Sequence, residues 1–198
     1  MKRVFAVFLA LGIILLLCAC GASAAKPEDT VTAFNEAMRD FDLDKMQSCT
    51  ASGNVVVKLN LEEELGEKLT AKMKEWASQI TYETESITEE GDHGTAVVRY
   101  SYVDANPVAM EFFRKYVNEA NAAAWSGESE KGFEALAAKI LEEALNTVET
   151  GETERVVEYP LIRVNREWKI EEVPQEVLYI LTADYLAALN SIAESIYS

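Results

Sequence analysis

The chain has 198 residues, of which 34 are Asp or Glu and 18 are Lys or Arg, so its formal net charge at pH 7 is −16. Proteins bind nucleic acids largely by neutralising phosphates with Lys and Arg, and this composition therefore argues against a nucleic-acid partner. We interpret the excess of acidic residues as solvated helix faces that keep the protein soluble, and not as a site for a cationic partner.

Residues 1–21 have the order of parts that is typical of a secretory signal. A basic start at Lys2 and Arg3 is followed by an apolar run over residues 4–17. This run is shorter than the about 20 apolar residues that a membrane-spanning helix needs. An uncleaved anchor and a plain secreted protein are the alternatives to cleavage and lipid attachment.

The end of this segment, Leu17-Cys18-Ala19-Cys20-Gly21, resembles the bacterial lipobox, in which a leucine stands three residues before the lipid-bearing cysteine and a small residue directly before it. The resemblance implies that residues 1–19 are a signal peptide and that Cys20 receives the lipid. Cys18 does not fit, because the bulky Leu17 precedes it. Two or more acyl chains give stable attachment. We therefore expect a membrane partner through the lipid on Cys20, on the extracytoplasmic face of a bacterial membrane.

We assign residues 20–26 to the lipidated cysteine and a short flexible tether. Residues 27–198 are then expected to form a single α+β domain. Cys49 is the one cysteine of this domain, so no disulfide is expected within it, and its helical context predicts a small buried hydrophobe. The sole histidine, His93, lies in a glycine-flanked turn. Neither residue is therefore expected to act as a nucleophile or as its base.

Two helices are predicted at the start of the domain. Pro27 is typical of a first helical residue, and apolar side chains recur after it at spacings of three and four. Asp42 is placed to cap a second, shorter helix. The apolar positions are Val31, Phe34, Met38 and Phe41 in the first helix and Leu43, Met46 and Cys49 in the second.

A strand, a helix and a β-hairpin are predicted next. Residues 54–59 resemble a short buried strand, and residues 61–80 follow a helical spacing in which Gly66 can mark the true start, since glycine costs about 1 kcal/mol inside a helix. The hairpin has strands over residues 80–88 and 95–103.

A two-helix insertion is predicted over residues 106–148. Asn106 fits the N-cap of its first helix and Pro107 the first helical position. We expect the two helices to pair through one apolar stripe each. The stripes are Met110, Phe113, Val117, Ala120 and Ala124, then Phe133, Leu136, Ile140, Ala144 and Val148.

A second hairpin and one helix end the predicted domain. The strands cover residues 155–164 and 168–173, and Pro160 should lie at a bulge or an edge because it has no backbone N–H. Pro174 then opens a single amphipathic helix. Trp76, Trp125 and Trp168 are assigned to the core, with Trp168 packed near Phe34.

Two stretches of the chain resemble the nuclear transport factor 2-like superfamily, which includes ketosteroid isomerase and SnoaL-like proteins. They are the opening helices, residues 27–38 and 42–46, and the closing hairpin at residues 164–170. The resemblance implies a cone made of a curved antiparallel sheet packed on the N-terminal helices, with an internal pocket. The two-helix insertion and the C-terminal helix depart from that compact pattern, and either could fill or cover the cone.

Candidate chemistry is sparse in this sequence. The superfamily's enzymes use carboxylates and tyrosines inside the cone, and the matching residue types here are Tyr82, Tyr100, Tyr102 and Asp104, which are also ordinary strand and turn residues. No metal site is predicted, because zinc wants several His and Cys ligands, and no cofactor is expected. We interpret the domain as a non-catalytic module that binds a small ligand or an envelope protein. The alternatives are a small-molecule enzyme that uses the cone pocket and a purely structural envelope protein.

Overall fold

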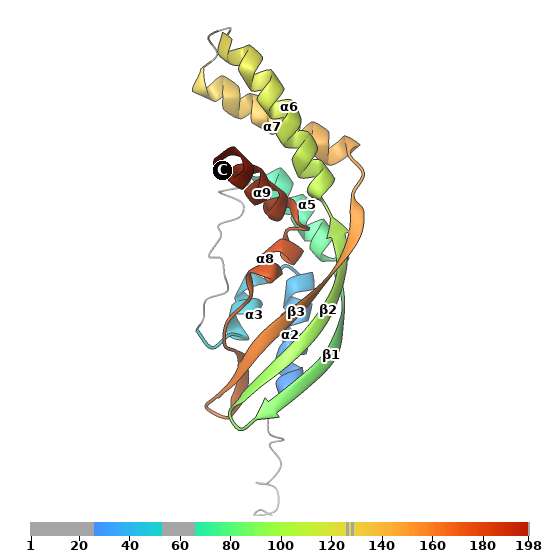
Figure 1. Cartoon of the computed structure of the whole chain (residues 1–198), viewed down its shortest axis with the longest axis vertical. Coiled ribbons are helices and arrows are strands. Elements are labelled where there is room, and N and C mark those ends of the chain that lie inside the picture. The colour runs from blue at the N-terminus through green and yellow to red at the C-terminus, as the bar shows by residue number, and fades with distance from the viewer. Residues whose placement is uncertain (1–25, 53–65, 126, 128, 198) are drawn as a thin grey trace, which may run out of the picture.

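The computed structural model describes residues 26–52, 66–125, 127 and 129–197 (Figure 1). The strand predicted at residues 54–59 lies outside the described residues. The helices are α2 (Pro27–Arg39), α3 (Leu43–Ser48), α5 (Glu67–Ala77), α6 (Asn106–Trp125), α7 (Glu130–Thr147), α8 (Gln175–Leu181) and α9 (Tyr185–Tyr197). The strands are β1 (Thr81–Glu90), β2 (His93–Asp104), β3 (Gly151–Val164) and β4 (Glu167–Ile170).

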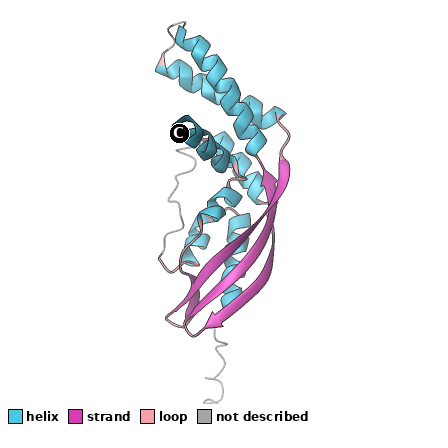
Figure 2. Ribbon diagram, in the orientation of Figure 1, coloured by secondary structure: helices cyan, strands magenta, loops and turns pink. Residues whose placement is uncertain are grey.

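The four strands form one antiparallel sheet in the order β1-β2-β3-β4. The sheet is curved, and α2, α3 and α8 lie on its concave side (Figure 2). Along β2 the burial alternates, because successive side chains of a strand point to opposite faces. Val98, Tyr100 and Tyr102 are buried under the helices, whereas Arg99 points to the open face. These features confirm the predicted class, an α+β fold with a curved antiparallel sheet packed on the N-terminal helices.

Asp42 and Gly66 have their predicted roles at helix ends, and two residues with positive φ form the last turn of the sheet. The Asp42 carboxylate accepts a hydrogen bond of 2.9 Å from the Lys45 N–H at the start of α3. Gly66 has a φ of 81°, and α5 begins directly after it. Asn165 and Arg166 have φ values of 53° and 73°, and they form the two-residue turn between β3 and β4 with the positive dihedral angles that such turns require.

Pro160 lies in β3 opposite Thr95 of β2, in continuous register and without a bulge. Its carbonyl accepts a hydrogen bond of 2.8 Å from the Glu171 N–H, just beyond the end of β4. In a strand, the backbone nitrogen and the carbonyl of one residue point to the same side. The Pro160 nitrogen, which has no hydrogen to donate, therefore faces the side of β3 on which the pairing with β4 has just ended. The predicted edge position is confirmed in this sense.

The helical hairpin of α6 and α7 extends from one end of the sheet and shares a second core with α5 and α9 (Figure 1). This core is separate from the one beneath the sheet, which contains Phe34, Tyr159 and Trp168. α2 begins at the opposite end of the long axis from the hairpin (Figure 1). The start of the domain and the hairpin are therefore at opposite ends of the molecule.

The predicted packing stripe of α6 is wrong. Val108 and Ala109 are buried, and Phe112 packs against the second core together with them, whereas Met110 is 49% exposed and Val117 38% exposed. α6 has two apolar faces, and the stripe that the spacing singled out is the uncovered one. Sequence spacing alone does not distinguish which of two apolar faces a neighbouring helix covers.

The prediction of a single C-terminal helix is also wrong, because the helix is interrupted between α8 and α9. Ala183 and Asp184 have φ values of 53° and 57°, in the left-handed region. The Ala183 carbonyl accepts a hydrogen bond of 2.8 Å from the Ala105 N–H, and Asp184 is bonded to side chains of the sheet. These contacts with β2, with β3 and with the residue after β2 compensate for the strained backbone.

Two of the three tryptophans are in the core as predicted. Trp168 and Trp76 are buried, but Trp125, at the end of α6, is 93% exposed. The assignment of Trp125 to the core is wrong, because the tip of the hairpin extends beyond every element that could cover it among the described residues.

Candidate functional site

A buried polar cluster joins α2 to the middle of the sheet. The Tyr100 hydroxyl donates to the Asn35 carbonyl oxygen Oδ1, and the Tyr100 and Tyr159 hydroxyl oxygens are 2.6 Å apart. Because the Tyr100 proton is directed to Asn35, the hydrogen bond between the two tyrosines is donated by Tyr159. All three side chains have no exposed surface, and burial raises the pKa of both tyrosines above its ordinary value.

The Asn35 amide nitrogen is buried, and no hydrogen-bond partner lies within reach among the described residues. A buried donor without a partner costs about 1 to 3 kcal/mol. The cluster is therefore a directed chain, from Tyr159 through Tyr100 to Asn35, with an unsatisfied amide at its end. Each tyrosine proton is already donated inside the protein, so neither hydroxyl is presented to solvent.

We expect Tyr100→Phe to lower the free energy of unfolding by about 1 to 3 kcal/mol, because it leaves the buried Asn35 Oδ1 without a donor. Tyr159→Phe should cost less, about 0.5 to 1.5 kcal/mol, because the Tyr100 hydroxyl can still donate to Asn35. Urea unfolding of both variants and the parent measures the difference. Equal losses, or a larger loss for Tyr159→Phe, would contradict the order of donors described above.

A second cluster lies where the sheet meets the α8–α9 break. The Tyr102 hydroxyl donates to Asp184 Oδ2 at 2.9 Å, and Arg155 donates to both, with Nε 3.0 Å from the Tyr102 hydroxyl and a terminal nitrogen 3.0 Å from Asp184 Oδ1. The Arg155 guanidinium also lies 5.7 Å from the ring centre of Tyr179. Burial raises the pKa of Tyr102 to about 12. The cluster holds the strained turn at Asp184 against the sheet.

The four tyrosine and aspartate residues singled out in the sequence do not form one group. Tyr100 and Tyr102 belong to the two different clusters, and Tyr82 on β1 is half-buried with its ring centre 6.5 Å from that of Tyr100. Asp104 accepts a hydrogen bond of 2.9 Å from the Asn106 N–H at the start of α6. Asp104, and not Asn106 as predicted, therefore provides the side-chain cap at this position, and the sequence signal for it was the turn-forming Asp-Ala-Asn-Pro string.

Other candidate residues have ordinary surroundings. Cys49 is buried as predicted, and burial raises the pKa of its thiol. His93 is exposed, with Nδ1 4.0 Å from a Glu171 carboxylate oxygen. In the part of the chain that the structure describes, no group of three or more His, Cys, Asp or Glu side chains is placed to hold a metal ion. Within the same part, no helix is both long and apolar enough to cross a membrane.

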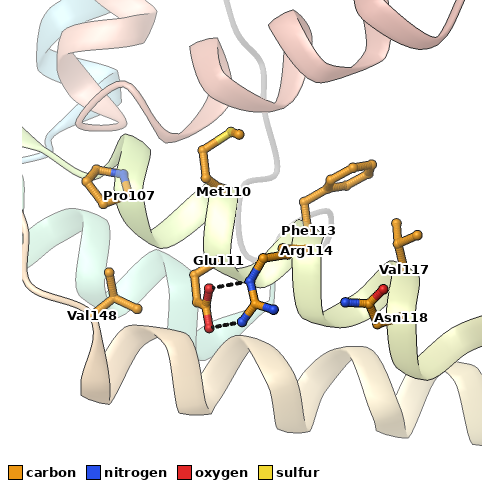
Figure 3. A pocket seen from close by; sticks show the side chains of 8 residues that line it. All are labelled: Pro107, Met110, Glu111, Phe113, Arg114, Val117, Asn118 and Val148. Atoms are coloured by element: carbon orange, nitrogen blue, oxygen red, sulfur yellow. Dashed lines mark hydrogen bonds and ion pairs between the residues drawn. The ribbon is translucent and has the colours of Figure 1, made fainter.

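The open face of α6 borders a groove of about 570 Å³ (Figure 3). Met110, Phe113 and Val117 project from the same side of α6, and a bidentate pair between Glu111 and Arg114, with contacts of 2.8 and 2.9 Å, lies beside them (Figure 3). The complete lining is Pro107, Met110, Glu111, Phe113, Arg114, Val117, Asn118 and Val148. This groove is shallow and apolar along one helix, so it offers contact area and little chemistry.

Sequence reasoning found the apolar groove residues Met110, Phe113, Val117 and Val148 but assigned them to the core, and it singled out none of the polar ones. A second apolar line of α6, Ala109, Phe112 and Tyr116, was also present in the sequence. In the structure Ala109 and Phe112 pack against the second core, and Met110 and Val117 are left exposed.

No protein-family model matches this chain, and no curated protein matches it. Among solved structures, the chain is similar to the crystal structure of a predicted lipoprotein, YcdA, from Bacillus subtilis, with 19% sequence identity and a TM-score of 0.38. The match covers 80% of this chain and 47% of that chain, so this chain spans about half the length of that protein. A likeness this distant carries no argument about function, and the nuclear transport factor 2-like assignment stays a prediction.

Proposed function

We propose that this protein is a lipid-anchored binding module on the extracytoplasmic face of a bacterial membrane, and that it binds a protein partner through the open apolar face of α6. The observation that carries the proposal is the exposure of Met110 and Val117, in line with Phe113, on a helix whose other apolar face is already covered. Exposed apolar patches with a polar rim mark protein interaction sites in many soluble proteins. The lipid anchor at Cys20 rests on the sequence.

Binding is favoured over catalysis because the tyrosine hydroxyls beneath the sheet are already engaged. The hydroxyls of Tyr100 and Tyr159 are fully buried and bonded to each other and to Asn35. A catalytic acid or base must come within hydrogen-bond reach of its substrate. The groove on α6, in contrast, is open to solvent and contains an ion pair whose two partners neutralise each other.

Site-specific photo-crosslinking in intact cells tests the proposal. A photoreactive residue at Met110 of the full-length protein should give one discrete adduct after irradiation, and the same residue at Val156 should give none. Val156 is the matched control, because it is 42% exposed and lies on the sheet, away from α6. Phe113→Glu in the same chain should abolish the Met110 adduct.

Equal adducts from both positions, or none from either, would contradict the proposal. An adduct with twice the mass of this chain would replace it with self-association. The thermal unfolding of the Phe113→Glu variant, followed by circular dichroism, checks that the loss of an adduct is not a loss of folding.

A further inference from the structure

We propose that the occupant of the α6 face is an amphipathic helix of the partner protein, with an apolar stripe and a basic polar face. This inference rests on the proposed function and adds the chemistry of the partner to it. It also revises the interpretation of the acidic composition, which the sequence alone attributes to solvated helix faces.

The shape of the surface favours a helix. Pro107, Met110, Phe113 and Val117 follow each other at spacings of three, three and four, which is one side of an α-helix. From Pro107 to Val117 this line is about 15 Å long and one helix wide. A narrow apolar strip of this kind is what an amphipathic helix recognises through side chains at every third or fourth position.

The net charge of the helical hairpin favours a basic partner. The described residues between 106 and 149 include seven carboxylates and four cationic side chains. The two charged residues that line the groove, Glu111 and Arg114, form a neutral pair, so the acidic surplus belongs to the hairpin as a whole. A partner with Lys or Arg beside its apolar stripe would meet this surplus, and such charges steer association and select among partners.

The same charge argues against a second copy of this chain as the occupant. Each copy has a formal net charge of −16 and would bring its own surplus of carboxylates to the interface. Like charges across an interface cost several kcal/mol. Trp125 adds to the preference for a basic partner, because its indole ring is 93% exposed and an indole face attracts Lys or Arg.

The position of the hairpin argues against the protein's own membrane as the occupant. α2 begins at the opposite end of the long axis from the hairpin (Figure 1). The residues between Cys20 and Pro27 can extend at most about 3.6 Å each. With the lipid on Cys20, the start of α2 stays within about 25 Å of the bilayer, and the α6 face belongs to the end of the domain that is farthest from this attachment.

Synthetic helices provide the test. The full-length lipidated protein is placed in nanodiscs of zwitterionic lipid, and fluorescence anisotropy measures binding of a labelled peptide of 18 residues with Leu at every third or fourth position and Lys elsewhere on its polar face. One comparison peptide has Glu in place of Lys, and another keeps the composition but scatters the Leu residues. Empty nanodiscs report any binding to lipid.

We expect the Lys peptide to bind at least tenfold more tightly than either comparison peptide. Met110→Glu combined with Val117→Glu should weaken its binding at least tenfold, and Val156→Glu, which adds one carboxylate on the sheet, should leave it within twofold. The preference over the Glu peptide should fall with added salt, because exposed charges are screened.

Several results would overturn the inference. If the Glu peptide binds as tightly as the Lys peptide, the partner does not need a basic face. If the scattered peptide binds as tightly, the partner does not need an apolar stripe. If the Met110→Glu, Val117→Glu variant keeps its affinity, the peptide does not bind at α6. Failure of all three peptides to bind also overturns it. Crosslinking from Met110 in cells is independent of these peptides, so a discrete adduct there with no peptide preference would leave the proposed function standing and remove this partner chemistry alone.

Discussion

Trp168→Ala should lower the free energy of unfolding by about 3 to 5 kcal/mol, as large-to-small changes in well-packed cores do. Trp168 is 1% exposed, and the core that it shares with Phe34 lies between the sheet and α2. Its carbonyl accepts a hydrogen bond of 2.8 Å from the Thr30 hydroxyl of α2, and the Arg163 guanidinium lies 4.5 Å from the centre of its ring. The backbone bond from Thr30 remains in the alanine variant, whereas removal of the buried indole leaves a cavity in the core that it shares with Phe34.

Urea unfolding of residues 26–198, followed by circular dichroism, measures this loss. Trp125→Ala is the matched control, since it removes the same side chain from a position that is 93% exposed, and it should change the stability by no more than about 0.5 kcal/mol. A loss below about 1 kcal/mol for Trp168→Ala, or similar losses for the two variants, would mean that Trp168 does not have the structural role described above.

The elements that the sequence predicted well are those whose signals are local. Asp42 caps α3 through its neighbour Lys45, and Gly66 precedes α5, and both interactions depend on residues within one turn of the chain. The two hairpins follow from strand patterns and from the turn residues between their strands, whereas the curved sheet that joins them was implied by the family resemblance. Such signals depend little on what the rest of the chain does.

The predictions that were wrong depend on contacts between distant parts of the chain. The α8–α9 break is fixed by Asp184 bonding to Tyr102 and Arg155 on the sheet, and these residues are far apart in the sequence. The helical spacing continues through the break, so nothing local indicates it. Trp125 and the stripe of α6 were assigned to the core for a similar reason, since an apolar spacing shows that a face exists but not whether anything covers it.

For the candidate site, the sequence predicted which types of residue take part but not which residues contact each other. Tyr100 and Tyr102 were singled out because tyrosines and carboxylates line the cone in the family that the sequence resembles. Their actual partners, Asn35 and Tyr159 for Tyr100 and Arg155 and Asp184 for Tyr102, come from helices and strands that no local pattern brings together. Met110, Phe113 and Val117 of the groove were named from the sequence as part of a packing stripe, and only the arrangement of α7 and α9 showed that Met110 and Val117 are open.

Cys20→Ala should abolish lipid attachment and leave the precursor uncleaved. The lipobox-like string places Leu17 three residues before Cys20 and the small Ala19 directly before it, and the thiol of Cys20 is the group that would receive the diacylglycerol. Without a thiol at this position no thioether can form, so the loss should be complete and not partial. Metabolic labelling with a radioactive or alkyne-bearing fatty acid, followed by electrophoresis, shows both the label and the size of the chain.

Cys18→Ala is the matched control, because it removes a thiol two residues away that follows the bulky Leu17. It should leave both labelling and processing close to those of the parent. If the Cys20→Ala chain is still labelled, still cleaved and still retained in the membrane, the anchor is not at Cys20. The short tether between Cys20 and Pro27 would then no longer hold the start of α2 near the lipid, and the α6 face would not be kept at the end of the domain far from the bilayer.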